Sequence, residues 1–215
     1  MSKITTCNDL DLLHPTLRAA WESGRFISRW RTRPQMIGQD IARLDLHLLE
    51  THRPTAEQRK RYEMRTPEGK RVTRCDGVIS WSRHQDNPST AMDLVVTLDG
   101  RMTWDMDDPL VRAGYHALRD AAESLGFESG GRWGWDWPHV QLWKHDRVAE
   151  VQRLLNALGY DCGEVDGIHG RRTDAALDRF GGTGARDRGA AHIRGRLGPA
   201  EWTALWRVAR ERGVA

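Results

Sequence analysis

Lysine and long apolar runs are scarce in this chain of 215 residues. Only four of the 33 basic residues are lysine, and 30 acidic residues leave a formal net charge of +3. This balance lacks the basic surplus of a nucleic-acid-binding tail, so we expect no nucleic-acid partner. The sequence has no run of about 18 apolar residues, so we expect no insertion into a membrane.

Cysteine is also rare. Cys7, Cys75 and Cys162 form no CxxC pair, and three cysteines cannot all pair within one chain, which argues against a disulfide framework. We expect them to be structural thiols. The first nine residues carry one lysine and no apolar run behind it, so we expect no secretory signal and synthesis in a cytoplasm.

Tryptophan, in contrast, is abundant, with ten residues against three Phe and three Tyr. Core filling is the expected role of Trp21, Trp30 and Trp202. Six others are concentrated in one stretch of the chain: Trp81, Trp104, Trp133, Trp135, Trp137 and Trp143. This concentration indicates a specialised region.

Residue patterns in the first two thirds of the chain predict an α+β fold with an antiparallel sheet and flanking helices. Pro15 begins a helix in the segment from Leu10 to Arg29, and Thr55 caps a second helix that has Gln58 at its third position. The remaining predicted elements are a hairpin from Ala91 to Trp104 turning at Asp99-Gly100, a helix from Leu110 to Leu125 and a strand from His139 to Trp143.

The last 70 or so residues predict a small three-helix unit. Its expected helices run from Val148 to Leu158, from Arg171 to Phe180 and from Pro199 to Arg212, and Gly159 ends the first of them. The Gly- and Arg-rich segment from Gly181 to Gly198 predicts a mobile loop. We therefore predict two domains, residues 1–144 and 145–215.

Four residues carry the chemistry expected of a metal site: His84, Asp93, Asp136 and His139. Two imidazoles and one carboxylate are a common catalytic zinc shell, because they fill three tetrahedral positions and leave the fourth for water. Asp136 lies three residues before His139, close enough for its carboxylate to act as a general base. Spacing alone makes such a site plausible.

The surrounding motifs resemble a family of zinc peptidases. Ser82-Arg83-His84, Ala91-Met92-Asp93-Leu94 and Asp136-Trp137-Pro138-His139 are similar to the paired signatures of the D-alanyl-D-alanine carboxypeptidase and L-alanyl-D-glutamate endopeptidase family, which includes phage endolysins. The resemblance extends over about residues 10 to 143.

The resemblance implies a role for each matching residue. His84, Asp93 and His139 would bind Zn²⁺, and Asp136 would activate water and protonate the leaving amine. Arg53 would stabilise the oxyanion. Binding of the substrate would fall to four further residues: Ser82, Trp133, Trp135 and Trp137.

One departure from the family pattern concerns the metal loop. The family has six residues between the first histidine and the aspartate, whereas eight separate His84 from Asp93. Asp86 is therefore a rival ligand.

The C-terminal third resembles the three-helix peptidoglycan-binding domain of cell-wall hydrolases. The similarity lies in the segments from Val151 to Tyr160 and from Val165 to Phe180. Within the second segment, Gly167 and Gly170 are expected to permit a tight turn, and Thr173 to cap the next helix. A helical bundle without a ligand is the alternative, because a fold does not dictate a function.

Together the two resemblances imply a phage-type endolysin that binds peptidoglycan, hydrolyses its stem peptide and acts as a monomer. The L-alanyl-D-glutamate bond is the favoured substrate, and the alternatives are a D-alanine cross-link or a terminal D-alanine. Such an enzyme is expected to wait in the host cytoplasm and to reach the wall at lysis. A non-catalytic wall-binding or structural phage protein is the alternative from another class.

Overall fold

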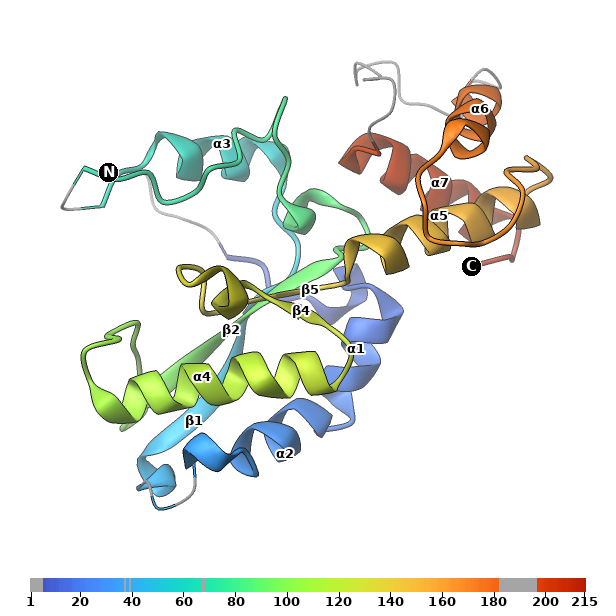
Figure 1. Cartoon of the computed structure of the whole chain (residues 1–215). Coiled ribbons are helices and arrows are strands. Elements are labelled where there is room, and N and C mark those ends of the chain that lie inside the picture. The colour runs from blue at the N-terminus through green and yellow to red at the C-terminus, as the bar shows by residue number, and fades with distance from the viewer. Residues whose placement is uncertain (1–5, 37, 39, 67–68, 182–196) are drawn as a thin grey trace. The chain divides into compact units, whose positions relative to one another are not determined.

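A computed structural model describes residues 6–36, 38, 40–66, 69–181 and 197–215 (Figure 1). Two compact units form, each from separate stretches of sequence: Met1–Arg53 with Ser89–Leu142, and Pro54–Pro88 with Trp143–Ala215. The boundary after residue 144 stays a prediction. Most of the predicted Gly181–Gly198 loop, residues 182–196, lies outside the described residues.

The first unit contains a five-stranded antiparallel sheet, which confirms the predicted α+β class. The strand order is β1-β2-β5-β4, and β3 pairs with β2. The strands are β1 (Leu44–Glu50), β2 (Ala91–Leu98), β3 (Arg101–Met102), β4 (Glu128–Ser129) and β5 (His139–Gln141).

The predicted hairpin is confirmed at β2 and β3. Asp99 and Gly100 both have positive φ, as a tight hairpin turn requires. Strand β1 was not predicted, although its sequence alternates apolar and polar residues from Leu44 to Leu48. It is nevertheless the main partner of β2, with Leu46 opposite Val96.

The helices of the first unit are α1 (Pro15–Glu22), α2 (Arg25–Arg31) and α4 (Pro109–Ser124). A helix beginning at Pro15 is confirmed, but its continuation to Arg29 is wrong. Gly24 takes a left-handed conformation with φ 71°, which ends α1 and lets α2 begin at the next residue.

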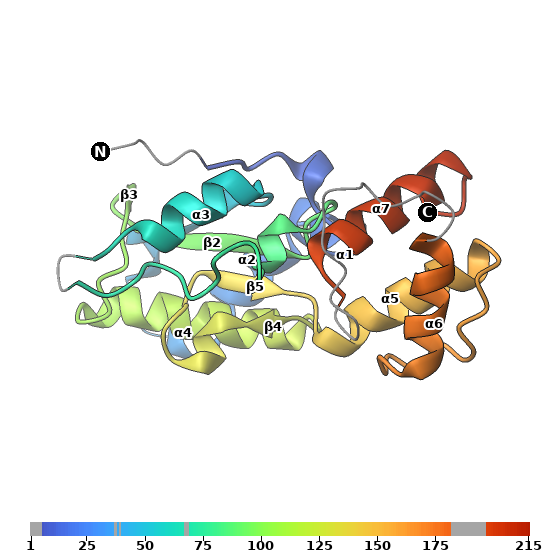
Figure 2. The same ribbon diagram turned by 90° about the horizontal axis from the view of Figure 1, so that it is seen from above.

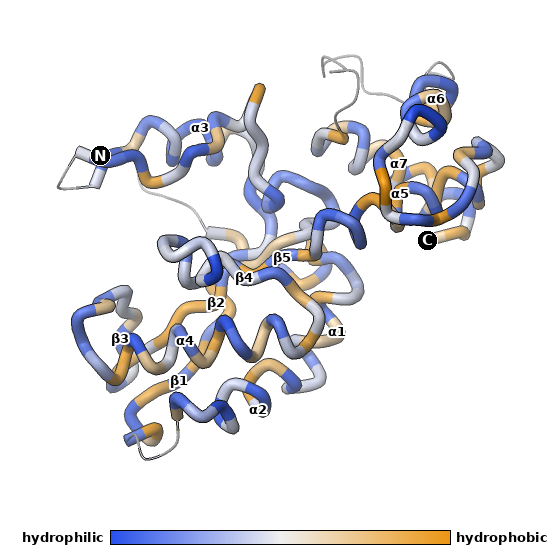
Figure 3. The backbone as a smooth tube through the Cα atoms, in the orientation of Figure 1, coloured by the Kyte–Doolittle hydropathy of each residue, from blue (hydrophilic) through white to orange (hydrophobic). Residues whose placement is uncertain are grey.

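One face of the sheet packs on these helices. Met92, Leu94 and Val96 alternate along β2 and are buried in the core together with Leu118 of α4. Figure 3 shows the hydrophobic colour concentrated along β1 and β2, and Figure 2 shows α4 running beneath the sheet. Because successive side chains of a strand alternate between faces, Asp93 belongs to the other face.

Four helices lie in the second unit: α3 (Thr55–Glu63), α5 (Lys144–Ala157), α6 (Arg171–Phe180) and α7 (Pro199–Glu211). The predicted helix from Thr55 is confirmed, but the N-cap role predicted for Thr55 is wrong, because Pro54 is the N-cap and Thr55 is the first helical residue. Thr55 instead accepts a hydrogen bond from Gln85, and Gln58 donates to the carbonyl of Cys75.

Helices α5, α6 and α7 confirm the predicted three-helix unit. Their shared core includes Leu154, Leu177, Phe180 and Trp202, and Cys162 is buried with them. Trp202 here and Trp30 in the first unit are fully buried, as predicted for core filling. Among the described residues, none of the helices has the length and apolar character needed to cross a bilayer.

Candidate metal centre

Three polar side chains lie in a row across the sheet. Glu50 of β1 is directly opposite Asp93 of β2, and Asp93 is directly opposite His139 of β5. A bulge between Leu48 and Glu50 shifts the register of β1, which brings Glu50 opposite Asp93. Directly opposed residues share a face, so the pairing itself gathers this group.

The His139 ring is held on both sides. Its Nδ1 lies 3.1 Å from Asp93 Oδ1, and its Nε2 lies 3.1 Å from Gln141 Oε1. Gln141 in turn donates to Glu128 Oε2 over 2.6 Å. Gln141 therefore favours a proton on Nε2, which leaves Nδ1 as the atom that a metal ion would use.

Asp136 belongs to a tight turn before β5. The amide of His139 donates to the carbonyl of Asp136 over 3.1 Å, and that carbonyl lies against Gly130. A Cβ at Gly130 would overlap it and would lie 2.9 Å from the Cβ of His139. The sequence from Asp136 to His139 can therefore adopt this turn only beside a residue without a side chain.

Arg53 is buried next to the same row. It forms an ion pair with Glu50, and its Nη2 lies 3.4 Å from Asp93 Oδ2. Only 6 % of its surface is exposed. This placement suits a side chain that orients the Asp93 carboxylate better than one that meets a substrate directly.

His84 lies on the short 3-10 turn Arg83–Gln85. Ser82 accepts from the amide of His84 over 3.4 Å. Ser82 and Gln85 also form a capping box, in which Gln85 Oε1 accepts from the amide of Ser82 over 3.0 Å. Gln85 also donates to Gly77 and Thr55. Ser82 thus fixes the local backbone that presents His84, which is 1 % exposed.

His84, Asp93 and His139 form a group that could hold a metal ion. Each offers one ligand atom, and these atoms lie within 4.8 Å of one another. Burial lowers the pKa of His139. The hydrogen bond to Asp93 and the charges of Asp136 and Asp93 outweigh this effect and raise the pKa to about 9.

The charges and donor types near this group fit a divalent cation. Glu50, Asp93 and Asp136 are formally anionic, and Arg53 supplies one positive charge, which leaves an excess of two negative charges. The raised pKa of His139 reports this anionic surrounding. Two imidazoles and one carboxylate also match the donors that zinc takes in catalytic sites.

Asp86, the rival ligand, has a different partner. Both of its carboxylate oxygens accept from Arg147 of α5, over 2.8 and 2.7 Å, and both side chains are buried. The next two residues are also held by helices of the second unit. Thr203 accepts from the amide of Asn87, and Trp202 donates to the carbonyl of Pro88.

The three tryptophans beside the Asp136 turn differ in placement. The Trp133 ring lies 5.5 Å from the His139 ring and 5.7 Å from the Trp135 ring, measured between centroids. Trp133 and Trp135 are 37 % and 48 % exposed. Trp137 instead stacks on His116 of α4 at 4.8 Å and packs against the core.

The loop between α5 and α6 is organised by Gln152. Its side chain accepts from the amides of Asp166 and Gly167 and donates to Ile168 O and Thr173 Oγ1. The predicted turn is confirmed at Gly167, which has φ 72°. The prediction for Thr173 is wrong, because α6 begins at Arg171 and the Thr173 hydroxyl is instead an acceptor for Gln152.

Sequence reasoning assigned no role to four buried residues that organise these sites: Glu50, Gln141, Arg147 and Gln152. Gln141 had a signal, since a glutamine two residues after His139 lies on the same face of a strand. Arg147 and Glu50 act through partners 61 and 43 positions away in the sequence, which no local pattern shows.

Comparisons with known proteins support the helical part of the chain. Residues 144–180 match the family model described as a putative peptidoglycan binding domain. No curated protein matches the chain. The match supports a peptidoglycan-binding domain that includes α5 and α6, and it supports peptidoglycan as a partner.

Proposed function

We propose that the chain is a zinc-dependent peptidoglycan peptidase of the endolysin type. The observation that carries the proposal is the His84, Asp93 and His139 group, present in one chain with a peptidoglycan-binding domain. The motifs around these residues, which resemble the zinc peptidase family, add support. We further propose residues 1–144 as the catalytic part and residues 145–215 as the wall-binding part.

Zinc held by these three residues would polarise the scissile carbonyl and lower the pKa of a bound water to about 7. Asp136 would accept the proton of that water and return it to the departing amine, as a general base and then a general acid. Its position is set by the turn against Gly130.

The surrounding residues would position substrate and ligands. Arg53 would hold the Asp93 carboxylate in place, with Glu50 balancing its charge. Trp133 and Trp135 would offer exposed indole faces to the stem peptide. Release from the host cytoplasm at lysis belongs to the same proposal.

Digestion of purified peptidoglycan sacculi by the full chain tests the proposal. We expect bound zinc by elemental analysis and a new amino terminus on D-glutamate by mass spectrometry of the products. New termini at the D-alanine cross-link, or release of one terminal alanine, would assign the alternative bonds. The Asp136→Asn variant should keep zinc and lose hydrolysis.

The non-catalytic alternative rests on the family match, which covers only the wall-binding helices, and on the long loop between His84 and Asp93. It predicts binding to sacculi without zinc and without new termini. That result, obtained with folded protein supplied with zinc, would replace the peptidase proposal.

A further inference from the structure

Glu128 lies at the centre of a hydrogen-bonded chain that leads from an exposed indole to His139. On β4 it is directly opposite Gln141 of β5. Glu128 Oε2 accepts from the Gln141 amide over 2.6 Å, and Glu128 Oε1 accepts from the Trp133 indole over 3.3 Å. Gln141 Oε1 lies 3.1 Å from His139 Nε2. One carboxylate therefore connects Trp133 to a candidate metal ligand.

The chemistry of Glu128 sets the direction of this chain. An ionised carboxylate only accepts hydrogen bonds, and an indole N–H only donates them. The Gln141 group that faces Glu128 is therefore the NH₂, which turns the amide oxygen toward His139. With a metal bound, an oxygen at this position holds the imidazole proton on Nε2 and leaves Nδ1 for the metal. The orientation of the Gln141 amide thus follows from Glu128.

Trp133 is held at both its nitrogen and its ring. The indole ring lies 5.5 Å from the His139 ring between centroids, with 36° between the planes. Trp133 ends the 3-10 turn Gly130–Trp133, which is capped by Ser129. Ser129 is fully buried and follows Glu128 on β4. Glu128 and the indole that it anchors therefore lie on one short continuous segment.

Trp133 is also the part of this chain that is open to contact from outside. It is 37 % exposed, whereas Gln141 and His139 are 8 % and 6 % exposed. A ligand that stacks on the indole therefore contacts a ring whose nitrogen is bonded to Glu128. The same carboxylate orients the partner of His139, so the exposed contact and the metal ligand share one residue.

We propose that Glu128 is a positioning residue that couples the Trp133 indole to the metal ligand His139. It fixes the Gln141 amide for metal binding and holds Trp133 as a wall of the same site. Because both hydrogen bonds orient one carboxylate, loss of the outer bond weakens the inner one, and metal affinity falls with it. The inference rests on the metal centre of the proposed function and does not require hydrolysis.

The zinc affinity of the full chain, measured by competition with a chelator, tests the coupling. Glu128→Leu removes both hydrogen bonds and should lower the affinity about tenfold, because such outer partners orient the ligand. Trp133→Phe keeps an aromatic ring beside His139 but removes the N–H donor, and should lower the affinity about threefold. In the Glu128→Leu background, Trp133→Phe should cause no further loss, because its effect passes through the carboxylate.

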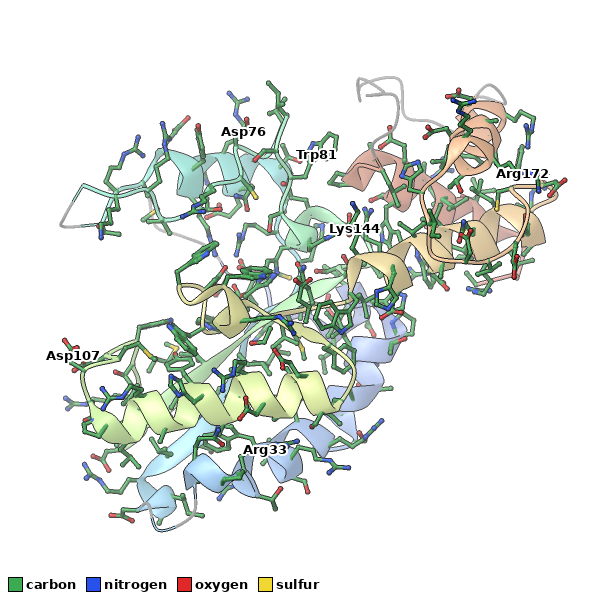
Figure 4. All side chains as sticks on the ribbon, viewed as in Figure 1. Arg33, Asp76, Trp81, Asp107, Lys144 and Arg172 are labelled. Carbon is green, nitrogen blue, oxygen red and sulfur yellow. The ribbon has the colours of Figure 1, made fainter. Side chains whose placement is uncertain are left out.

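Two control variants lie elsewhere in the first unit. Trp104→Phe makes the same change at an indole that is 53 % exposed. Asp107→Leu removes an exposed carboxylate on the loop before α4, labelled in Figure 4. Each should change the zinc affinity less than about twofold, because exposed charges and rings at a distance are screened by solvent. Gln141→Leu cuts the chain on its inner side and supplies a second background if Glu128→Leu does not fold.

An equal loss from Trp133→Phe in the native and Glu128→Leu backgrounds would overturn the inference, as would an unchanged zinc affinity in either single variant. Digestion of sacculi is scored separately. Coupled zinc binding without hydrolysis would refute the peptidase and leave the role of Glu128 standing, whereas hydrolysis with independent effects would do the reverse. A native chain that binds no zinc would refute both.

Discussion

In the helical domain, α5 and α6 follow one another within residues 144–180 and pack together, whereas the candidate metal centre pairs Asp93 with His139 across 46 positions. The first arrangement follows from helical periodicity and nearby turns. The second depends on strand register and on a bulge in β1. The two regions therefore differ in how much of their geometry is encoded by local sequence. The family match covers only the helical region.

The largest expected effect is a loss of hydrolysis at the metal centre, with wall binding by the helical domain unchanged. His139→Ala should lower hydrolysis of sacculi by at least about 1,000-fold, because loss of the metal removes several kcal/mol of transition-state stabilisation. Sedimentation with sacculi should show wall binding retained. His47→Ala, at an exposed histidine of β1, is the control and should leave both properties unchanged.

A single substitution in α5 should affect both regions. Arg147→Met leaves the Asp86 carboxylate buried without its counterion, which typically costs about 3–5 kcal/mol of unfolding free energy. Chemical denaturation measures this loss. Replacing both partners, as in Asp86→Leu with Arg147→Met, should recover much of it.

Unfolding of Arg147→Met at the same denaturant concentration as the native chain would contradict the stabilising role of the Asp86–Arg147 ion pair. Arg207→Met supplies the reference, because Arg207 of α7 is exposed and pairs with Glu211 on the surface. That variant should shift stability by less than about 0.5 kcal/mol.

Within the helical domain alone, Gln152→Leu should disturb the loop from Asp166 to Ile168. It removes the acceptor of the part-buried amides of Asp166 and Gly167, and the loss of each hydrogen bond costs about 0.5–1.5 kcal/mol. We expect weaker binding to sacculi and an unchanged zinc content. A fall in zinc content with wall binding intact would contradict the assignment of Gln152 to the helical domain.

The mildest expected effect concerns Gln141. Gln141→Leu removes the acceptor that fixes the His139 ring, and loss of such a partner typically lowers metal affinity about 10- to 100-fold. Competition with a zinc chelator measures the change. Gln141→Glu combined with Glu128→Gln keeps an acceptor for His139 and a donor–acceptor pair with residue 128, and should retain most of the affinity.

Much of the fold was predictable because its signals are local. Proline at the first positions of α1, α4 and α7, the Asp99-Gly100 turn and the apolar period of α5 each lie within a few residues. Strand β1 was not predicted, although its apolar and polar residues alternate. The pattern also predicted one helix where Gly24 separates α1 from α2. Both depend on packing that a single segment does not reveal.

The candidate site was predictable only in part. Residue types and motif resemblance pointed to His84, Asp93 and His139, which the structure groups together. They left Asp86 as a rival, because sequence spacing does not show the bidentate partner that Arg147 supplies from 61 residues away. They also presented three tryptophans as equivalent, whereas Trp137 packs on His116 and the core.

Anomalous diffraction at the zinc edge from crystals of the full chain tests the central claim most directly. We expect one peak about 2.0–2.1 Å from a ring nitrogen of His84 and of His139, and about 2.0–2.2 Å from a carboxylate oxygen of Asp93. A peak at Asp86 would contradict this ligand set. No peak from crystals grown with zinc would contradict the metal centre itself.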